Sequence, residues 1–130
     1  MKRLALLILL GAAAVAGCGG GGDSSSTTAT AAALTSCNIN GKQRDFNASY
    51  VTSIQVSKAT CPQAEEVIAM YHHCRLQSGP DGTCDSTVRG FKCKDGNRQG
   101  VPNVQYNATA KCHKVSNASK RVKSRYTQND

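Results

Sequence analysis

Residues 60–71 read TCPQAEEVIAMY, and this stretch predicts the clearest helix of the chain. Thr60 and Gln63 have the spacing of a capping box, and Pro62 suits a first helical turn. The apolar side chains that follow recur at helical spacing along one stripe: Ala64, Val67, Ile68 and Tyr71. Gly79-Pro80 is expected to end the helix. The stripe predicts one helix that buries a single face.

The segments on either side of this helix have the pattern of β-strands. Four runs are expected to form strands: Tyr50–Ser57, which carries an irregularity, Thr87–Lys94, Asn107–Val115 and Arg121–Thr127. The last run is mostly polar and predicts an edge strand, whereas Asp95–Pro102 is rich in turn residues and predicts a loop. The economical fold is therefore α+β in two layers, with one helix packed on an antiparallel sheet of three to four strands.

The N-terminus has the layout of a secretory signal peptide. Met1-Lys2-Arg3 is positive, and an apolar run from Leu4 leads to small residues up to Gly17. This run is shorter than the roughly 20 residues that a spanning helix needs. Val15-Ala16-Gly17-Cys18 resembles the lipobox of bacterial lipoproteins. The resemblance implies cleavage before Cys18, diacylglycerol on its sulfur, an acylated amino terminus, and a place on the outer face of the bacterial cytoplasmic membrane.

Composition divides the chain into three parts. Residues 1–17 are the expected signal peptide, and residues 18–36 are almost wholly Gly, Ser, Thr and Ala after the cysteine. Such a segment buries too little to offset the cost of ordering and is expected to be a flexible linker. Residues 37–130 are expected to form one small domain with only 19 large apolar or aromatic side chains. Disulfides are expected to supplement so thin a core.

The seven cysteines divide into one plus six. If Cys18 carries lipid, the remaining even set predicts three disulfides in an exported domain: Cys37, Cys61, Cys74, Cys84, Cys93 and Cys112. Many connectivities are open. Cys61 and Cys74 lie about 20 Å apart on the predicted helix, too far to pair with each other. One arrangement joins Cys74 to Cys84 across a turn, Cys93 to Cys112 between two strands, and Cys37 to Cys61.

Three short motifs in the domain carry a second resemblance. They are Cys61-Pro62-Gln63-Ala64-Glu65-Glu66-Val67, Gly90-Phe91-Lys92-Cys93, and Cys112 before a last strand. Over Val51 to Tyr126 they resemble a recurrent small domain of secreted proteins and lipoproteins of high-GC Gram-positive bacteria, with the pattern C-x-x-A-x-x-V … G-[WF]-x-C … C. The resemblance implies the fold but no activity, because that family has none established. Cys37, Cys74 and Cys84 are additions to the pattern.

Histidines and carboxylates raise two further hypotheses. His72, His73 and His113 lie near cysteines, but zinc needs thiolates and paired cysteines supply none, so neither a metal nor a cofactor is expected. His72 and His73 are expected at a solvated helix end. A ribonuclease-like hydrolase would use Glu65 or Glu66 as base and His72 or His113 as acid. No fixed motif links these residues, so the hydrolase is the alternative to a non-enzymatic protein.

Basic residues are concentrated in the second half of the domain. Residues 89–125 contain ten Lys and Arg against the single acid Asp95, in a chain with 16 basic and eight acidic residues. This excess favours either a solvated sheet face or a surface that binds anionic lipid or cell-wall polymer. The candidate residues for that surface are Lys111, Lys114, Lys120, Arg121, Lys123 and Arg125. Nucleic acid is not an expected partner, because only Phe91, Tyr106 and Tyr126 lie near enough in sequence to stack on bases.

Overall fold

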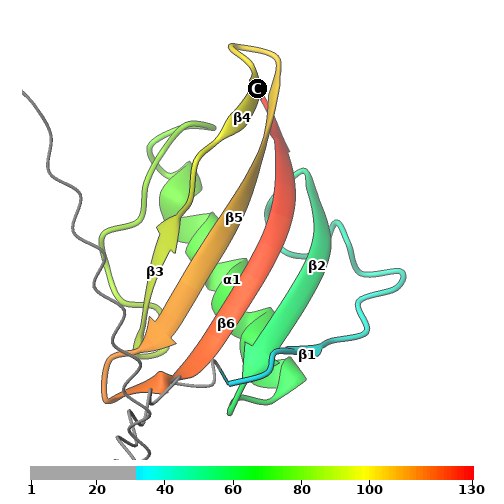
Figure 1. Ribbon diagram of the computed structural model, residues 1–130. Helices are drawn as coiled ribbons and strands as arrows, with labels where there is room; N and C mark the ends of the chain where they lie inside the picture. The colour runs from blue at the N-terminus through cyan, green and yellow to red at the C-terminus, as the bar shows by residue number, and fades with distance from the viewer. Residues whose placement is uncertain (1–31) are drawn as a thin grey trace, which may run out of the picture.

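The computed structural model describes residues 32–130. The predicted signal peptide (1–17), the lipid site at Cys18 and the linker as far as residue 31 lie outside the described residues. The elements in chain order are β1 (Thr35–Ser36), β2 (Tyr50–Ser57), α1 (Cys61–Leu76), β3 (Phe91–Asp95), β4 (Gln99–Val101), β5 (Gln105–Lys114) and β6 (Asn117–Asn129). In Figure 1, α1 lies behind an antiparallel sheet, which confirms the predicted α+β class in two layers.

The sheet has six strands rather than the three to four expected, in the order β1-β2-β6-β5-β3, with β4 also paired to β5. The short strands β1 and β4 account for the difference. Thr35 and Ser36 pair with Val56 and Gln55, so the ordered sheet begins just before Cys37. Strands of two and three residues are too short to show an alternating pattern, so nothing marks them in the sequence.

The prediction of an edge strand over residues 121–127 is wrong in its placement. β6 is 13 residues long and lies in the middle of the sheet, between β2 and β5. Its inward residues Val122, Ser124 and Tyr126 are buried under the helix. Its outward residues are polar because a two-layer fold leaves one face of even a central strand in water. These outward polar residues give β6 the mostly polar composition that is typical of an edge strand.

The core lies between α1 and the inner face of the sheet. The predicted helical stripe is buried along its whole length: Ala64, Val67, Ile68 and Tyr71. Thr60 accepts a hydrogen bond from the Gln63 amide, as the capping box predicts, and the helix ends at Leu76, three residues before Gly79. The irregularity expected in β2 is a register shift between Val51 and Ser53. Within residues 32–130, no helix has the length and apolar character needed to cross a membrane.

The last turn of α1 carries a charged side chain into the core. Arg75 is fully buried. Its guanidinium donates hydrogen bonds to His72 Nδ1 (2.8 Å), the Tyr106 hydroxyl (2.9 Å), Gln128 Oε1 (2.6 Å) and the Pro80 carbonyl (2.9 Å). These partners come from α1, the following loop, β5 and β6, so one side chain ties all four together. His72 is itself buried instead of lying at a solvated helix end, and its ring lies 4.4 Å from that of Tyr126.

Three disulfides fix the helix and the sheet at separate points. Cys37–Cys61 joins the segment after β1 to the start of α1, Cys74–Cys84 joins the end of α1 to the next loop, and Cys93–Cys112 links β3 to β5. These pairs are the arrangement considered from the sequence. Their sequence separations are 24, 10 and 19 residues. Each such bridge typically stabilises a fold by about 2–4 kcal/mol, which supplements the thin core.

Candidate functional site

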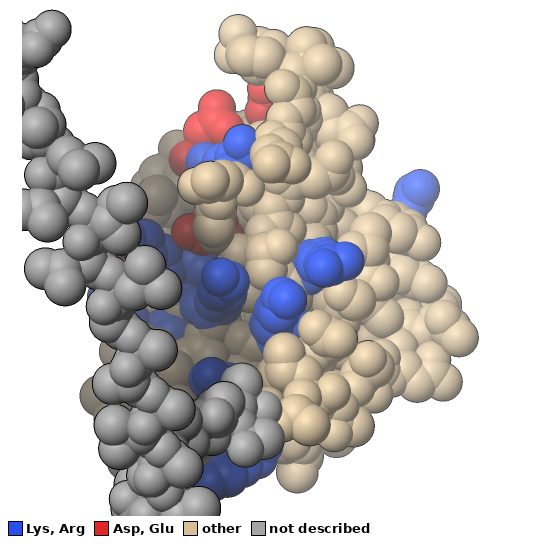
Figure 2. Space-filling model, in the orientation of Figure 1, with Lys and Arg blue, Asp and Glu red and all other residues tan. Residues whose placement is uncertain are grey.

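The helix covers one face of the sheet, and the other face is open to solvent (Figure 1). Side chains alternate between the two faces along each strand. In β5, Ala110 and Cys112 are buried on the helix side, whereas Lys111 and His113 are exposed on the outer side. The outward basic residues of β6 are Arg121, Lys123 and Arg125. Figure 2 shows Lys and Arg side chains gathered on this outer face.

The strand register aligns these cations in rows across the sheet. Lys94 of β3 pairs with Lys111 of β5, which in turn pairs with Lys123 of β6. The next row aligns Lys92, His113 and Arg121 in the same way. Neighbouring strands lie about 4.8 Å apart, and residues on one face follow each other at about 6.7 Å along a strand. The outer basic face is the set Lys92, Lys94, Lys111, Arg121, Lys123 and Arg125.

Acidic side chains do not neutralise the outer basic face. Among residues 32–130, the ion pairs are formed by Lys42, Arg89 and Arg98 with carboxylates elsewhere, and none includes a member of this face. The Lys92 ammonium donates a hydrogen bond to the Asp85 backbone carbonyl, which is a neutral acceptor. No carboxylate of the described residues therefore pairs with the positive charges of the two rows.

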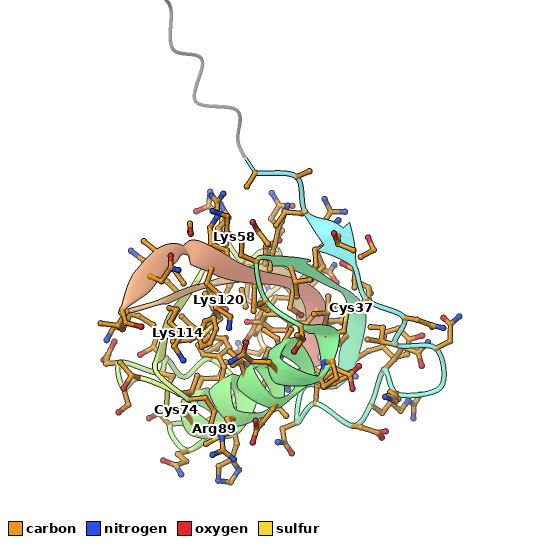
Figure 3. The ribbon with its side chains drawn as sticks, turned by 90° about the horizontal axis from the view of Figure 1, so that it is seen from below. Cys37, Lys58, Cys74, Arg89, Lys114 and Lys120 are labelled. Carbon is orange, nitrogen blue, oxygen red and sulfur yellow. A yellow bond between two sulfur atoms is a disulfide. The ribbon has the colours of Figure 1, made fainter. Side chains whose placement is uncertain are left out.

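The structure separates the six residues predicted for an anionic surface. Lys111, Arg121, Lys123 and Arg125 lie on the outer basic face. Lys114 and Lys120 belong to the end of β5 and the start of β6, and Figure 3 shows both on the side of the sheet that faces α1. The Lys114 ammonium lies 5.3 Å from the centroid of the Phe91 ring, which belongs to the core. The predicted set therefore belongs to two surfaces.

Lys92 and Lys94 were not in the predicted set, although they complete both rows. A signal for them exists in the sequence. Lys92-Cys93-Lys94 alternates a cation with a cysteine, and Lys111-Cys112-His113 does the same. Because Cys93 and Cys112 are paired and buried, the residues on either side of both must share the opposite face.

A cavity of about 610 Å³ opens beside the edge strand β3. Tyr71, Cys84 and Cys93 contribute to its lining, as do lysines of the outer basic face. Asp95 also lines it and accepts three hydrogen bonds: from the Tyr71 hydroxyl (2.8 Å), the Tyr126 hydroxyl (2.7 Å) and Arg98 (3.0 Å). This carboxylate is thus fully engaged in holding side chains around it.

The two tyrosines beside Asp95 are held in their neutral form. Burial, reinforced by the hydrogen bond to Asp95, raises the pKa of Tyr71 well above its usual value. Burial also raises the pKa of Tyr126, against the opposing charge of Arg75. Both phenols therefore remain donors at physiological pH. The cluster has the character of a structural network, in which each donor has an acceptor.

The residues of the hydrolase hypothesis are not brought together. Glu65 pairs with Lys42 at 3.0 Å, and Glu66 pairs with Arg89, both near the start of α1. His72 is buried in the core, while His113 stands among the lysines of the outer face. Within residues 32–130, no group of three or more His, Cys, Asp or Glu is placed to hold a metal ion.

Comparison of the chain with protein families, with curated proteins and with solved structures finds no match. The two resemblances described from the sequence therefore remain predictions. The candidate site rests on the geometry of the outer basic face.

The alignment of like charges across the sheet costs stability. Lys111 lies between Lys94 and Lys123, and directly opposed cations destabilise a sheet. Lys111→Gln should therefore raise the free energy of unfolding by about 0.5 kcal/mol in urea titrations at low ionic strength. The gain should vanish near about 1 M salt, where such repulsion is screened. Lys42→Gln, which removes an equal charge from an ion pair, should give no gain; an equal gain in both variants would contradict this account.

The second prediction uses the buried histidine. Burial first, and then the charge of Arg75, lower the pKa of His72 from 6.5 to about 3. Between these values the unfolded chain binds a proton that the folded state does not. The free energy of unfolding should therefore fall as the pH is lowered from about 6.5, by at most about 1.4 kcal/mol per pH unit.

The measurement is urea unfolding at several values between about pH 7 and 5, above the range in which carboxylates titrate. His72→Gln should flatten the dependence on pH. His73→Gln should leave it unchanged, because His73 is exposed. An identical slope in wild type and His72→Gln would show that His72 is not held neutral.

Proposed function

We propose that this protein is a lipid-anchored, non-enzymatic module on the outer face of a bacterial membrane, and that its outer basic face binds an anionic polymer of the cell envelope. The observation that carries the binding proposal is the alignment of uncompensated cations. Lys94, Lys111 and Lys123 face one another across three strands, with no acid between them. Such an arrangement costs stability in the free protein, and an anionic ligand removes that cost.

The shape of the surface favours an extended ligand. The outer basic face spreads over β3, β5 and β6, with cations about 4.8 Å apart across strands and about 6.7 Å along them. A chain of regularly spaced phosphates or carboxylates can meet several of these positions at once, because its charges also repeat over several ångströms. A single small anion would contact only one or two of them.

The same surface offers little to a nucleic acid base. Phe91, Tyr106 and Tyr126 are buried on the inner side, and Tyr50, which is 40% exposed, is the one aromatic residue of the described chain that is not buried. Base recognition on single strands depends on exposed aromatic platforms. The ligand is therefore expected to be recognised by its charge and not by stacking.

The location outside the cytoplasm has support from the disulfides. All six cysteines of residues 32–130 are paired, which is characteristic of proteins in oxidising compartments. The lipid anchor rests on the lipobox-like residues Val15 to Cys18. Two or more acyl chains hold a protein stably on a membrane, so this one cysteine suffices as an anchor.

The anchor is tested by the intact mass of the mature protein expressed in a bacterial host. Wild type should begin at Cys18 and carry the added mass of its acyl groups, and it should partition into detergent. Cys18→Ala should lack that mass and remain in the aqueous phase. Equal partitioning of the two proteins would contradict the proposed anchor.

Polymer binding is tested by calorimetry with polyglycerol phosphate as the probe, on the chain from Gly19 onward. Lys111→Gln/Lys123→Gln should weaken binding by about tenfold, since two exposed charge contacts of up to about 1 kcal/mol each are lost. The control Lys58→Gln/Lys120→Gln changes the net charge equally, away from the face, and should stay within about twofold of wild type. Equal weakening by both pairs would reduce the effect to net charge and contradict the proposed site.

A further inference from the structure

The lower end of the domain carries a second group of cations that the outer basic face does not include. Figure 3 views the molecule from this end and labels its members, Lys58, Arg89, Lys114 and Lys120. They come from four segments: the end of β2, the turn before β3, the end of β5 and the start of β6. The register places these segments together, since Ser57 pairs with Arg121 and Phe91 pairs with Lys114.

Two apolar side chains are exposed at the same end. Val115, in the turn between β5 and β6, is 63% exposed, and its amide donates a hydrogen bond to the Gly90 carbonyl (2.9 Å) beside Arg89. Leu34 is 39% exposed and directly precedes β1, whose Thr35 pairs with Val56 near the end of β2. The lower end therefore exposes two apolar side chains in a region that also carries several basic ones.

The opposite end of the sheet provides an internal comparison. Val101 and Val104 are 62% and 58% exposed there, so an exposed valine by itself does not distinguish the two ends. However, the residues around this upper pair include the acids Asp81 and Asp130, and Arg98 is engaged by Asp81 and Asp95. Of these two ends of the sheet, the lower one combines an exposed valine with lysines that form no ion pair within residues 32–130.

The described part of the chain also begins near the lower end, just before β1 (Figure 1). The described residues begin at Ala32, three residues before β1, and 13 residues separate Ala32 from Cys18. This segment reaches at most about 50 Å when fully extended, more than the roughly 35 Å length of β5. A lipid on Cys18 would thus permit several orientations, but it reaches the lower end with the least extension.

We infer that the lower end docks on the surface of an anionic lipid bilayer. Val115 and Leu34 enter the headgroup layer, while Lys58, Lys114 and Lys120 contact anionic headgroups. Arg89 contributes less, because it is paired with Glu66. The strands then stand upright on the membrane, and the outer basic face is directed sideways into the envelope. The orientation of the lower end toward the membrane rests on the proposed lipid anchor. The tests use protein that carries no lipid.

The first test uses tryptophan fluorescence, since the chain contains no tryptophan. The protein is the chain from Gly19 onward, which keeps every described element and all three disulfides. Val115→Trp and Val104→Trp place the probe in two exposed turns about 35 Å apart. Both are mixed at low ionic strength with vesicles of phosphatidylglycerol and phosphatidylcholine.

The emission of Val115→Trp should shift to shorter wavelength on these vesicles, and that of Val104→Trp should not. Vesicles of phosphatidylcholine alone should shift neither. No shift for Val115→Trp, or an equal shift for both variants, would overturn the inference.

The second test compares two charge-matched variants by vesicle sedimentation. Lys58→Gln/Lys120→Gln leaves Lys114 over the Phe91 ring and should weaken binding to the anionic vesicles about 30-fold, which corresponds to about 1 kcal/mol per basic residue. Lys111→Gln/Lys123→Gln should weaken it less than about threefold. Equal losses would overturn docking by the lower end. Polymer binding by Lys111→Gln/Lys123→Gln is measured in a separate experiment. The proposed function and this inference can therefore fail independently.

Discussion

A single helix can cover only one face of a sheet, and this constraint determines the rest of the domain. Most of the buried apolar side chains of residues 32–130 come from α1 and from alternate residues of β2, β6, β5 and β3, and the loops before β2 and β3 contribute the rest. The outer face must therefore be polar. In this chain it is also strongly basic, although a mixture of polar and oppositely charged residues would have been equally soluble and less costly.

So thin a layer needs other sources of stability. The three disulfides act at the beginning of the helix, at its end and at the edge of the sheet. Near the end of the helix, Arg75 adds hydrogen bonds to β5, β6 and the loop after α1, while Tyr126 presents its ring 4.7 Å from the guanidinium. These neutral acceptors satisfy the N–H groups of the guanidinium, which lowers the cost of burying its charge. Asp95 likewise stabilises the core by accepting hydrogen bonds from Tyr71, Tyr126 and Arg98.

Much of the fold follows from local patterns in the sequence. The stripe Ala64 to Tyr71 predicted the buried face of α1, and the alternating runs predicted the long strands, because each pattern extends over several turns or pleats. β1 and β4 lacked such a pattern because of their length. The centre position of β6 depends on which segments the register brings together, and no local window contains that information. The burial of His72 has a local signal, because His72 follows Ile68 by four residues and so continues the apolar stripe of α1.

The candidate site, like the fold, could be predicted from the sequence only in part. The excess of basic residues was visible in the sequence, but its separation into two surfaces was not. Adjacent residues in a strand point to opposite faces, so His113 stands on the outer face while Lys114 turns toward the helix side. Lys94 joins Lys111 and Lys123 only through pairing between strands. The net charge of a segment does not show on which face each basic residue lies or which residues it meets on the neighbouring strands.

Binding of an anionic polymer to the outer basic face can be followed residue by residue. The most direct measurement is a titration of the ¹⁵N-labelled chain from Gly19 onward with polyglycerol phosphate, followed by backbone amide NMR shifts. The account predicts shifts concentrated on the outward residues of β3, β5 and β6, centred on Lys94, Lys111 and Lys123. Shifts spread evenly over all basic residues, or their absence at low ionic strength, would contradict it.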